Sequence, residues 1–240
     1  MSQDDRVAII TGAGRGIGRA VARALAEEGY RVVLAARTGP ELDEAVSEIT
    51  ADGGEALAVP TDVTDATAVA QLVHRAVERF GGVDVLVNNA GGGRALRVGD
   101  SQFEDLAGVV ATNLLGTMYV TRAALPYLLR RPGAAVVNIA SSSGVRGQGG
   151  IAAYSAAKAG VLRFSEALFD EAREQGLKVC AICPGFVDTT LLDKDAPLDR
   201  TKMIAPEDIA DAVVYVVGTS PRVCPTELTL RPQRTPMLKR

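Results

Sequence analysis

The sequence is poor in the residues that build metal and thiol sites: it has one histidine and three cysteines. The histidine, His74, lies in a polar helical pattern, where a solvated side chain is the usual case. Cys180 and Cys183 are spaced as C-x-x-C, but their apolar run is typical of a buried strand, in which side chains three apart point to opposite faces. We therefore interpret both cysteines as small core residues, and we predict no histidine triad, no disulfide framework and no metal site.

Long apolar runs and an excess of one charge are also missing. No segment reaches the roughly 18 uninterrupted apolar residues of a membrane-spanning helix. The acidic start MSQDDRVAII differs from a secretory signal peptide, which has a basic start and a longer apolar core. The formal net charge is −3, with both signs interspersed, which argues against a nucleic-acid or anionic-membrane surface. We expect a cytoplasmic protein that binds neither nucleic acid nor membrane.

The sequence does contain a regular alternation of strand-like runs and helical patterns. The runs are rich in β-branched residues and nearly continuously apolar, as strands buried on both faces are. They cover residues 6–10, 31–36, 55–60, 83–89, 134–140 and 177–183, and a last one lies near 226–230. The alternation predicts a single doubly wound, Rossmann-type α/β domain over residues 1–240, with a mostly parallel seven-stranded sheet flanked by helices on both faces. The basic, proline-containing tail from about residue 231 to 240 is either disordered or folds back after the last strand.

A glycine-rich segment, TGAGRGIG at residues 11–18, follows the first strand and opens the first helix. Gly12 and Gly16 permit turns or a close backbone approach that a Cβ would block. The helix start offers free N–H groups to a pyrophosphate. The segment lacks the Gly-Lys-Ser/Thr ending of a nucleoside-triphosphate loop, which argues against a kinase or NTPase. The alternative is a glycine-rich turn without a ligand.

The end of the second strand indicates which dinucleotide would bind. Folds that bind NAD place Asp or Glu there, to accept hydrogen bonds from the ribose 2′-hydroxyl. Here Ala36 stands at or near that position, Arg37 follows it, and Arg15 lies in the glycine loop. Two guanidinium groups and no carboxylate favour a 2′-phosphate, and therefore NADP(H) over NAD(H). The alternative is that Arg37 is an ordinary exposed charge.

Tyr154 and Lys158 stand four residues apart in the small-residue run AAYSAAKAG. Helical spacing places them on one face, one turn apart. A free tyrosine has a pKa of about 10, and a nearby ammonium lowers it by stabilising the phenolate. Such a pair would take a proton from an alcohol or give one to a carbonyl that is being reduced. The alternative is that Tyr154 packs and the Lys158 side chain only extends along the surface.

Polar residues follow two of the predicted strands, where ligands bind in a doubly wound sheet. Three serines, residues 141–143, come directly after one strand, and asparagine and glycine at residues 87–93 follow another. Asn113 lies inside an otherwise mixed helical pattern. A buried asparagine in a helix needs partners, so we expect Asn113 to hold a bend or a water molecule.

Taken together, these motifs resemble the short-chain dehydrogenase/reductase family, of the NADP(H)-preferring type. The matching residues are Thr11, Gly12, Ala13, Gly14, Arg15, Gly16, Ile17, Gly18, Asp62, Val63, Asn88, Asn89, Ala90, Gly91, Asn113, Ser141, Tyr154, Lys158, Pro184 and Gly185. They run in the family's order and cover most of the chain.

The resemblance implies a role for each catalytic position. Tyr154 would be the general acid/base, and Lys158 would tune it and bind the nicotinamide ribose. Ser141 would orient and polarise the substrate oxygen; it is preferred to Ser142 and Ser143 because the family spaces its serine and tyrosine in this way. Asn113 would support a water molecule that relays protons to Lys158.

The resemblance and the arginine pattern also give a set of expected cofactor contacts. Asp62 would contact the adenine, and the segment after Pro184 would lie against the nicotinamide amide. The expected cofactor-binding residues are Gly12, Gly14, Arg15, Gly16, Ile17, Gly18, Arg37, Asp62, Val63, Asn89, Ala90, Gly91, Tyr154, Lys158, Pro184, Gly185, Val187 and Thr189.

The implied activity is hydride transfer between NADP(H) and a small-molecule carbonyl or secondary alcohol. Two alternatives use the same fold: a non-catalytic NADP(H)-binding regulator, and an isomerase or dehydratase acting at the same site. The presence of both Tyr154 and Lys158 favours the redox enzyme over the regulator.

The chain departs from the family pattern in two places. Many relatives have a glycine pair after the last strand, which this tail lacks. The segment 188–208 is short for a substrate lid, which suggests an open pocket.

We expect the protein to assemble as a homotetramer, with a dimer as the second choice. Phe164, Leu168 and Phe169 would be buried either against a second subunit or against the sheet.

Overall fold

One parallel sheet of seven strands forms the centre of the structure. The computed structural model describes residues 6–93, 95–190 and 197–237. The strand order is β3-β2-β1-β4-β5-β6-β7, and every neighbouring pair is parallel. The strands are β1 (Val7–Thr11), β2 (Arg31–Ala36), β3 (Ala56–Pro60), β4 (Val85–Asn88), β5 (Ala135–Ile139), β6 (Lys178–Pro184) and β7 (Glu227–Leu230). The predicted Rossmann-type α/β fold is confirmed.

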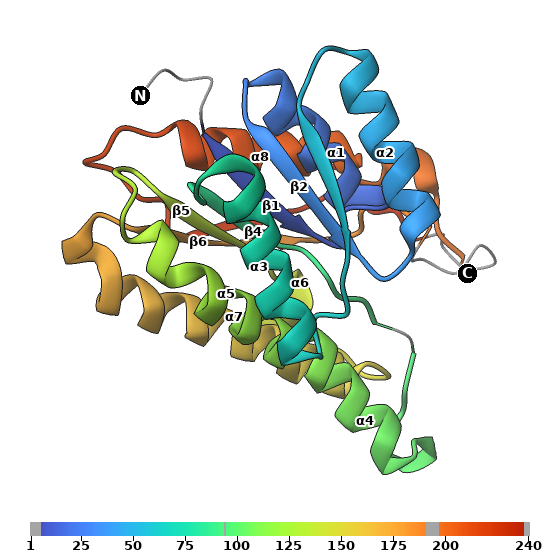
Figure 1. The fold of residues 1–240 in the computed structure, drawn as a ribbon. Helices are drawn as coiled ribbons and strands as arrows, with labels where there is room; N and C mark the ends of the chain where they lie inside the picture. The colour runs from blue at the N-terminus through green and yellow to red at the C-terminus, as the bar shows by residue number, and fades with distance from the viewer. Residues whose placement is uncertain (1–5, 94, 191–196, 238–240) are drawn as a thin grey trace.

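Helices cover both faces of this sheet (Figure 1). One face carries α1 (Gly16–Glu27), α2 (Gly39–Ala51) and α8 (Pro206–Gly218), and the other carries α3 (Ala66–Phe80), α5 (Gly116–Leu128) and α7 (Ala152–Ala172). The remaining helical segments are α4 (Phe103–Val110), η3 (Ala111–Leu115), α6 (Ser142–Val145) and the short turns η2 (Val98–Asp100), η4 (Arg173–Gln175) and η5 (Arg200–Lys202). No helix within the described residues is long and apolar enough to cross a membrane.

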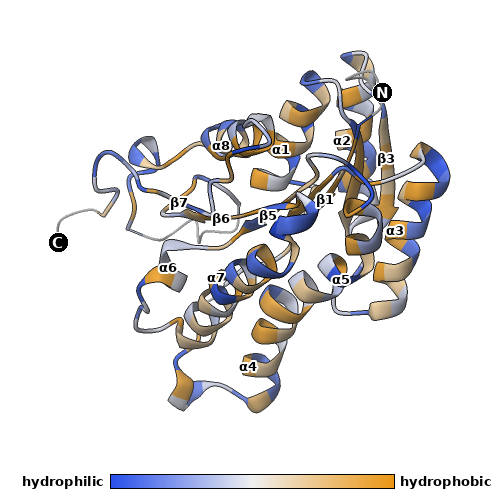
Figure 2. Cartoon of the chain, turned by 90° about the vertical axis from the view of Figure 1, so that its left-hand side faces the viewer, coloured by the Kyte–Doolittle hydropathy of each residue, from blue (hydrophilic) through white to orange (hydrophobic). Residues whose placement is uncertain are grey.

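The central strands are mostly apolar because both of their faces are covered (Figure 2). In β1, Ala8 and Ile10 belong to the core beside α1 and α8, whereas Val7 and Ile9 belong to the core beside α3 and α5. The same alternation separates the two cysteines of β6. Cys180 lies in the first core, and Cys183 packs with residues of α7 on the opposite face, as predicted.

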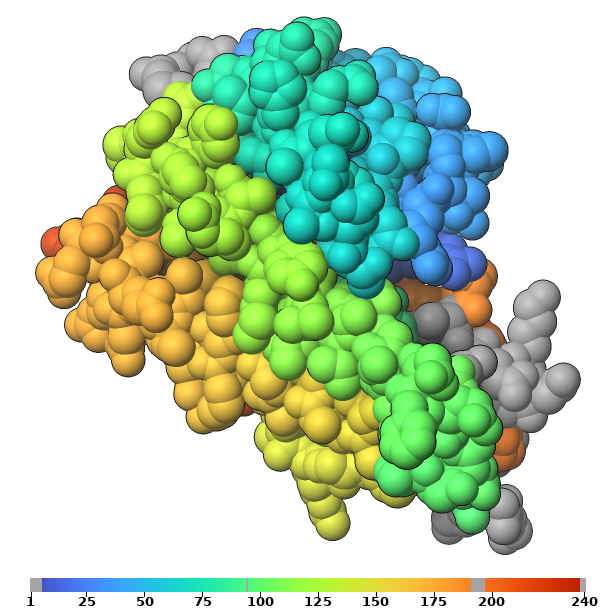
Figure 3. All heavy atoms as spheres, turned by 60° about the horizontal axis from the view of Figure 1, so that its bottom comes forward, coloured from blue at the N-terminus to red at the C-terminus, as the bar shows by residue number. Residues whose placement is uncertain are grey.

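The helical face opposite α1 shows α3, α5 and α7 packed side by side, with α4 projecting beyond them (Figure 3). Leu168 of α7 is buried in the core of this face, and Phe164 and Phe169 pack against the same core while remaining partly accessible. Leu168 is thus buried toward the sheet, and the accessible parts of Phe164 and Phe169 leave their contact with a second subunit as an expectation.

The tail folds back after β7. Residues 231–237 run along the segment that precedes α8: Met237 forms an antiparallel bridge with Leu198, and the Asp199 N–H donates to the Pro236 carbonyl. Of the two arrangements expected for the tail, residues 231–237 show the folded-back one; residues 238–240 lie outside the described residues.

The strand order reverses between β1 and β4, because β2 leaves β1 on one side and β4 continues on the other. Segments that follow the two strands diverge at such a point and open a crevice at the carboxyl edge of the sheet. The glycine loop follows β1, and Asn89 follows β4. The candidate site therefore lies at this edge.

Candidate active site

A cavity of about 770 Å³ opens at the carboxyl edge of the sheet. Its wall combines Ile17 at the start of α1, the ends of β4, β5 and β6, and the first turns of α7, whereas Gly12, Gly16 and Gly18 do not line it. The expected site residues in this wall are Ile17, Asn89, Gly91, Ser141, Tyr154, Lys158, Pro184, Gly185, Val187 and Thr189. Residues far apart in the sequence thus meet at the place that the fold predicts.

The glycine loop adopts a conformation that other residues would strain. Gly12 and Gly16 have φ values of 66° and 54°, in the left-handed region. A Cβ on Gly12 would lie 2.8 Å from the Asn89 amide nitrogen, and a Cβ on Gly18 would collide with the Gly12 carbonyl. Helix α1 therefore starts as close to β1 and β4 as backbone atoms permit.

At the start of α1, the side chain of the N-cap residue accepts no hydrogen bond from the first backbone N–H groups. Arg15 is the N-cap residue and makes no capping hydrogen bond through its side chain, and the first turn contains no acidic residue. The first N–H groups of a helix have no partner within the helix, and together with the helix dipole they favour an anion. This edge of the cavity can bind a phosphate group.

Lys158 is almost completely buried, with 4% of its surface exposed. Its ammonium donates a 2.8 Å hydrogen bond to the Ile139 carbonyl at the end of β5 and lies 5.8 Å from the centre of the Tyr154 ring. Burial disfavours the charged form and lowers the pKa of Lys158 to about 8. The amine therefore titrates near neutral pH, where it can exchange a proton.

The pKa of Tyr154 departs from the sequence-based expectation. Burial raises the pKa of this phenol above its ordinary value, and a hydrogen bond with the Ser141 side chain offsets only part of the rise. The expectation that Lys158 lowers the Tyr154 pKa is thus wrong for this arrangement. Burial of the phenol is the dominant cause of the shift, and the Lys158 ammonium donates its hydrogen bond to the Ile139 carbonyl.

Ser141 occupies the turn between β5 and α6. It is the N-cap of α6, where its hydroxyl oxygen accepts a 3.1 Å hydrogen bond from the Ser143 N–H. Ser142 and Ser143 also line the cavity. The hydrogen bond with Tyr154 distinguishes Ser141 from both neighbours.

Asn113 lies on the π-turn η3 between α4 and α5, with 1% of its surface exposed. Its side chain accepts from the Gly92 N–H at 3.0 Å and donates to the Gly92 carbonyl at 2.9 Å. A Cβ on Gly91 would lie 2.5 Å from the Asn113 Oδ1 atom and 3.4 Å from the Lys158 nitrogen. Asn113 thus sits on the expected bend and fixes the glycine segment beside Lys158.

Some expected cofactor contacts lie outside the wall of this cavity. Arg15, Arg37 and Asp62 are exposed near the carboxyl ends of β1 to β3. Hydrogen bonds from the Thr64 N–H and hydroxyl hold the pKa of Asp62 below its usual range, and the charge of Arg37 lowers it further. These side chains form a polar edge that continues the cavity wall toward β3.

Gly14, Val63 and Ala90 differ from the exposed residues of this edge. Val63 is buried, and its side chain fills the space beside Gly116 at the start of α5. Ala90 packs against the core beside α3 and α5, and Gly14 is covered by Glu41 of α2. Packing accounts for the positions of all three residues.

Several cavity residues were not singled out from the sequence. A Cβ on Gly93 would lie 2.9 Å from the Tyr154 ring, so the backbone of Gly93 passes close to this ring. The run of three glycines at 91–93 could have indicated such a close approach from the sequence. Ile139 contributes its backbone carbonyl, which no sequence pattern reveals. Other unpredicted wall residues are Gly92, Ala95, Ala140, Gln148, Ile151, Phe186 and Thr190.

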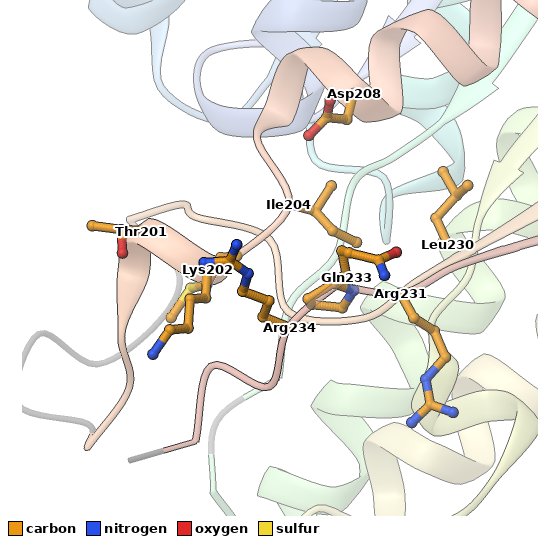
Figure 4. Close-up of a pocket in the computed structure, with 10 residues that line it drawn as sticks. Thr201, Lys202, Ile204, Asp208, Leu230, Arg231, Gln233 and Arg234 are labelled. Carbon is orange, nitrogen blue, oxygen red and sulfur yellow. The ribbon is translucent and has the colours of Figure 1, made fainter.

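A second cavity of about 460 Å³ lies between the tail, β7 and the segment before α8 (Figure 4). Its charged groups largely serve the fold: Lys202 pairs with Asp199 at 2.7 Å, and Asp208 accepts from the Ala205 N–H at 2.8 Å to cap α8. The Arg231 and Arg234 side chains point in different directions. Among the described residues, no cluster of three or more His, Cys, Asp or Glu is placed to hold a metal ion.

Comparison with known proteins identifies the family. The short chain dehydrogenase family model matches residues 6–199, well over half of the chain. An uncharacterized oxidoreductase of Staphylococcus aureus is 39% identical over 228 residues, which cover 95% of this chain and 97% of the relative. An uncharacterized oxidoreductase of Staphylococcus haemolyticus is also 39% identical, over 227 residues and the same shares of the two chains.

Solved structures agree with this assignment. A variant of actinorhodin polyketide ketoreductase, crystallised with NADPH, superposes with a TM-score of 0.90 at 35% identity and covers 96% of this chain and 97% of its own. A dehydrogenase/reductase from Sinorhizobium meliloti gives a TM-score of 0.87 at 30% identity, covering 94% and 93%. The chain belongs to the short-chain dehydrogenase family of oxidoreductases.

Proposed function

We propose that the protein transfers a hydride between NADP(H) and a small-molecule carbonyl or secondary alcohol, with Tyr154 as the general acid/base. The observation that carries this proposal is the convergence of Tyr154, Lys158 and Ser141 on one cavity at the carboxyl edge of the sheet. The similar ketoreductase structure, which contains NADPH, supports the same reaction class.

The backbone of the glycine loop fits a dinucleotide pyrophosphate. Gly12 and Gly16 adopt left-handed conformations, and side chains at Gly12 or Gly18 would obstruct the approach of β1, β4 and α1. The uncapped start of α1 would donate N–H groups to the phosphates, with Ile17 in the cavity wall beside them.

The exposed edge beyond the loop favours NADP(H) over NAD(H). Arg37 follows β2 directly, Ala36 provides no carboxylate, and Arg15 is exposed at the start of α1. Two guanidinium groups suit the dianionic 2′-phosphate, whereas a ribose 2′-hydroxyl needs an acceptor. Asp62 would accept a hydrogen bond from the adenine amino group, with Val63 beside it.

The opposite end of the cavity would hold the nicotinamide. NADPH, when bound, supplies the hydride. The backbone around Asn89, Ala90 and Gly91 would follow the nucleotide, and Lys158 would hydrogen-bond its ribose. On the other side, Pro184, Gly185, Val187 and Thr189 would lie against the nicotinamide ring and amide.

Tyr154 would donate its proton to the substrate oxygen in the reductive direction. Because burial raises its pKa, the phenol keeps its proton at neutral pH and is ready to act as an acid. Ser141, bonded to the same phenol, would donate a hydrogen bond to the substrate oxygen and stabilise the charge that develops there.

Lys158 and Asn113 would complete the proton path. The Lys158 pKa of about 8 lets its ammonium supply a proton toward Tyr154 at neutral pH. We propose that Asn113 supports a water molecule on this path. The contacts of its side chain with Gly92 also keep the adjoining glycine segment in place beside Lys158.

A panel of aldehydes, ketones, sugars, steroids and quinones, each assayed with NADPH and NADH, tests the proposal. Consumption of NADPH in proportion to the carbonyl compound supports it. Conversion of a compound without a change in NADPH absorbance would instead indicate an isomerase or dehydratase. Tight NADPH binding without turnover of any compound would favour a non-catalytic regulator.

We also propose that the protein assembles as a homotetramer, with a dimer as the second choice. The support is exposed apolar side chains on α4, η3 and α5: Phe103 is 87% exposed, and Leu115 and Tyr119 are each 38% exposed. Large apolar side chains exposed on a monomer favour association with a matching surface.

A further inference from the structure

A chain of buried amide and hydroxyl groups crosses from the sheet to the helices below the cavity. Asn88 of β4 donates to the Asn138 side-chain oxygen at 2.8 Å, and Asn138 of β5 donates to the Ser165 hydroxyl at 2.8 Å. Ser165 of α7 then donates to the Val161 carbonyl at 2.7 Å. At most 4% of Asn88, Asn138 or Ser165 is exposed. We call Asn88, Asn138 and Ser165 the amide chain.

The amide chain joins three walls of the cavity. Asn138 immediately precedes Ile139, whose carbonyl accepts from the Lys158 ammonium. Ser165 lies two helical turns after Lys158 on α7, so it shares a face with that residue. Asn88 immediately precedes Asn89, whose side chain donates to the carbonyls of the glycine loop. Lys158 is thus held by a carbonyl that the amide chain ties to both β4 and α7.

Such a chain is costly in a strand that could be entirely apolar. Burying an amide is unfavourable unless its hydrogen bonds are satisfied. Within the described part of the chain, the Asn88 side-chain oxygen is buried and has no hydrogen-bond partner, so part of this cost is not recovered. A fully buried β5 needs only apolar side chains to pack. The gain we identify is a fixed orientation, because connected buried polar groups specify one arrangement of their elements.

We propose that Asn138 and Ser165 are positioning residues for the reacting groups: they fix the Ile139 carbonyl relative to α7 and thereby hold Lys158 and Tyr154 in place. This rests on the proposed function for its effect on turnover. It needs no contact of either residue with the substrate, since both lie below the cavity wall.

Thr121 provides a matched control. Its hydroxyl accepts from the Asn88 side chain at 2.9 Å, on a branch that leads to α5 instead of α7. Thr121 is 2% exposed, as is Ser165. Thr121→Val therefore removes one buried hydrogen bond of the same kind without touching the link from β5 to α7.

The experiment compares Asn138→Leu, Ser165→Ala, Ser165→Thr and Thr121→Val with the wild type. Protein labelled with ¹³C at lysine Cε gives the pKa of Lys158 by NMR, and the five lysines of the chain keep the spectrum simple. Steady-state kinetics give kcat and KM, and thermal unfolding gives stability. Lys158→Met assigns the Lys158 signal.

We expect Asn138→Leu and Ser165→Ala to shift the pKa of Lys158 by at least about half a unit and to lower kcat about tenfold. Small displacements of reacting groups from their productive geometry slow the reaction strongly. Ser165→Thr keeps the hydroxyl and should restore both values. Thr121→Val should lower the thermal stability about as much as Ser165→Ala does, while leaving the pKa of Lys158 unchanged.

A Lys158 pKa that is unchanged in Ser165→Ala would overturn the proposal. A shift of this pKa in Thr121→Val as large as that in Ser165→Ala would overturn it too. If Asn138→Leu does not fold, the Ser165→Ala and Ser165→Thr pair decides the question. If the wild type reduces no carbonyl compound, the proposed function fails, whereas the titration still tests the positioning.

Discussion

At the scale of single residues, burial governs the two titratable side chains of the cavity. It lowers the Lys158 pKa to about 8 and raises that of Tyr154 above its ordinary value, so the Lys158 ammonium is the stronger acid of the two. Their spacing on one helical face was predictable, but the direction of the Tyr154 shift was not. That shift comes from burial of the phenol, which depends on how distant segments of the chain pack around it.

The raised pKa of Tyr154 predicts different pH profiles for the two directions of the reaction. Below its pKa the phenol is protonated, so the acid form needed for reduction predominates at neutral pH, and reductive kcat/KM should be nearly flat there. Oxidation needs the phenolate, whose fraction rises about tenfold per pH unit below the pKa. Oxidative kcat/KM should therefore climb from about pH 6 to about pH 9. An oxidative profile that is flat or falls over this range would contradict the assignment.

Arg37 predicts the cofactor preference. Arg37→Asp replaces a donor for the 2′-phosphate with an acceptor for the ribose 2′-hydroxyl, and charge-assisted hydrogen bonds contribute about 1.5–3 kcal/mol. The ratio of kcat/KM for NADPH over NADH should fall on the order of 100-fold. Arg75→Asp, at an exposed position on α3, is the control and should keep the wild-type ratio. An unchanged ratio in Arg37→Asp would show that this arginine is an ordinary surface charge.

At the scale of elements, the strands were predictable because parallel strands buried on both faces are apolar almost without interruption. The structure places β2 at residues 31–36, as predicted, and the other strands within two residues of their predicted ends. The π-turn at Asn113 was visible only as a polar residue in a helix. Its geometry depends on Gly92, which is distant in the sequence.

The junction of β1 and α1 predicts a steric effect. Gly18→Ala would place a Cβ against the Gly12 carbonyl, and relief of such overlap costs about 1–3 kcal/mol. We expect NADPH to bind at least about tenfold more weakly, as measured by calorimetry. Gly108→Ala is the matched control, since nothing lies within 4 Å of a Cβ at that position of α4. It should keep NADPH affinity and raise stability by about 0.5–1 kcal/mol. Equal NADPH affinity in Gly18→Ala and the wild type would rule out close packing at this junction.

At the scale of the whole molecule, the strand–helix alternation predicted the topology and hence the edge at which the site lies. The path of the tail was not predictable. It is set by contacts of Pro236 and Met237 with Leu198 and Asp199, and nothing in the local pattern of either segment specifies the other.

The exposed apolar side chains of α4 and α5 predict assembly. Size-exclusion chromatography with light scattering at micromolar concentration should give the mass of a homotetramer. Phe103→Asp should reduce that mass if α4 lies in a subunit contact, because it places a charge on the most exposed aromatic side chain of the described residues. A monomeric wild type would contradict the proposed assembly.

The most direct test of the account is Tyr154→Phe, which removes only the phenolic oxygen. With a carbonyl compound that the wild type reduces, kcat should fall at least about 100-fold, while the dissociation constant of NADPH stays within about threefold of the wild-type value. Tyr215→Phe, on the exposed side of α8, is the control and should retain wild-type turnover. Wild-type turnover in Tyr154→Phe would contradict the central claim that Tyr154 is the proton donor.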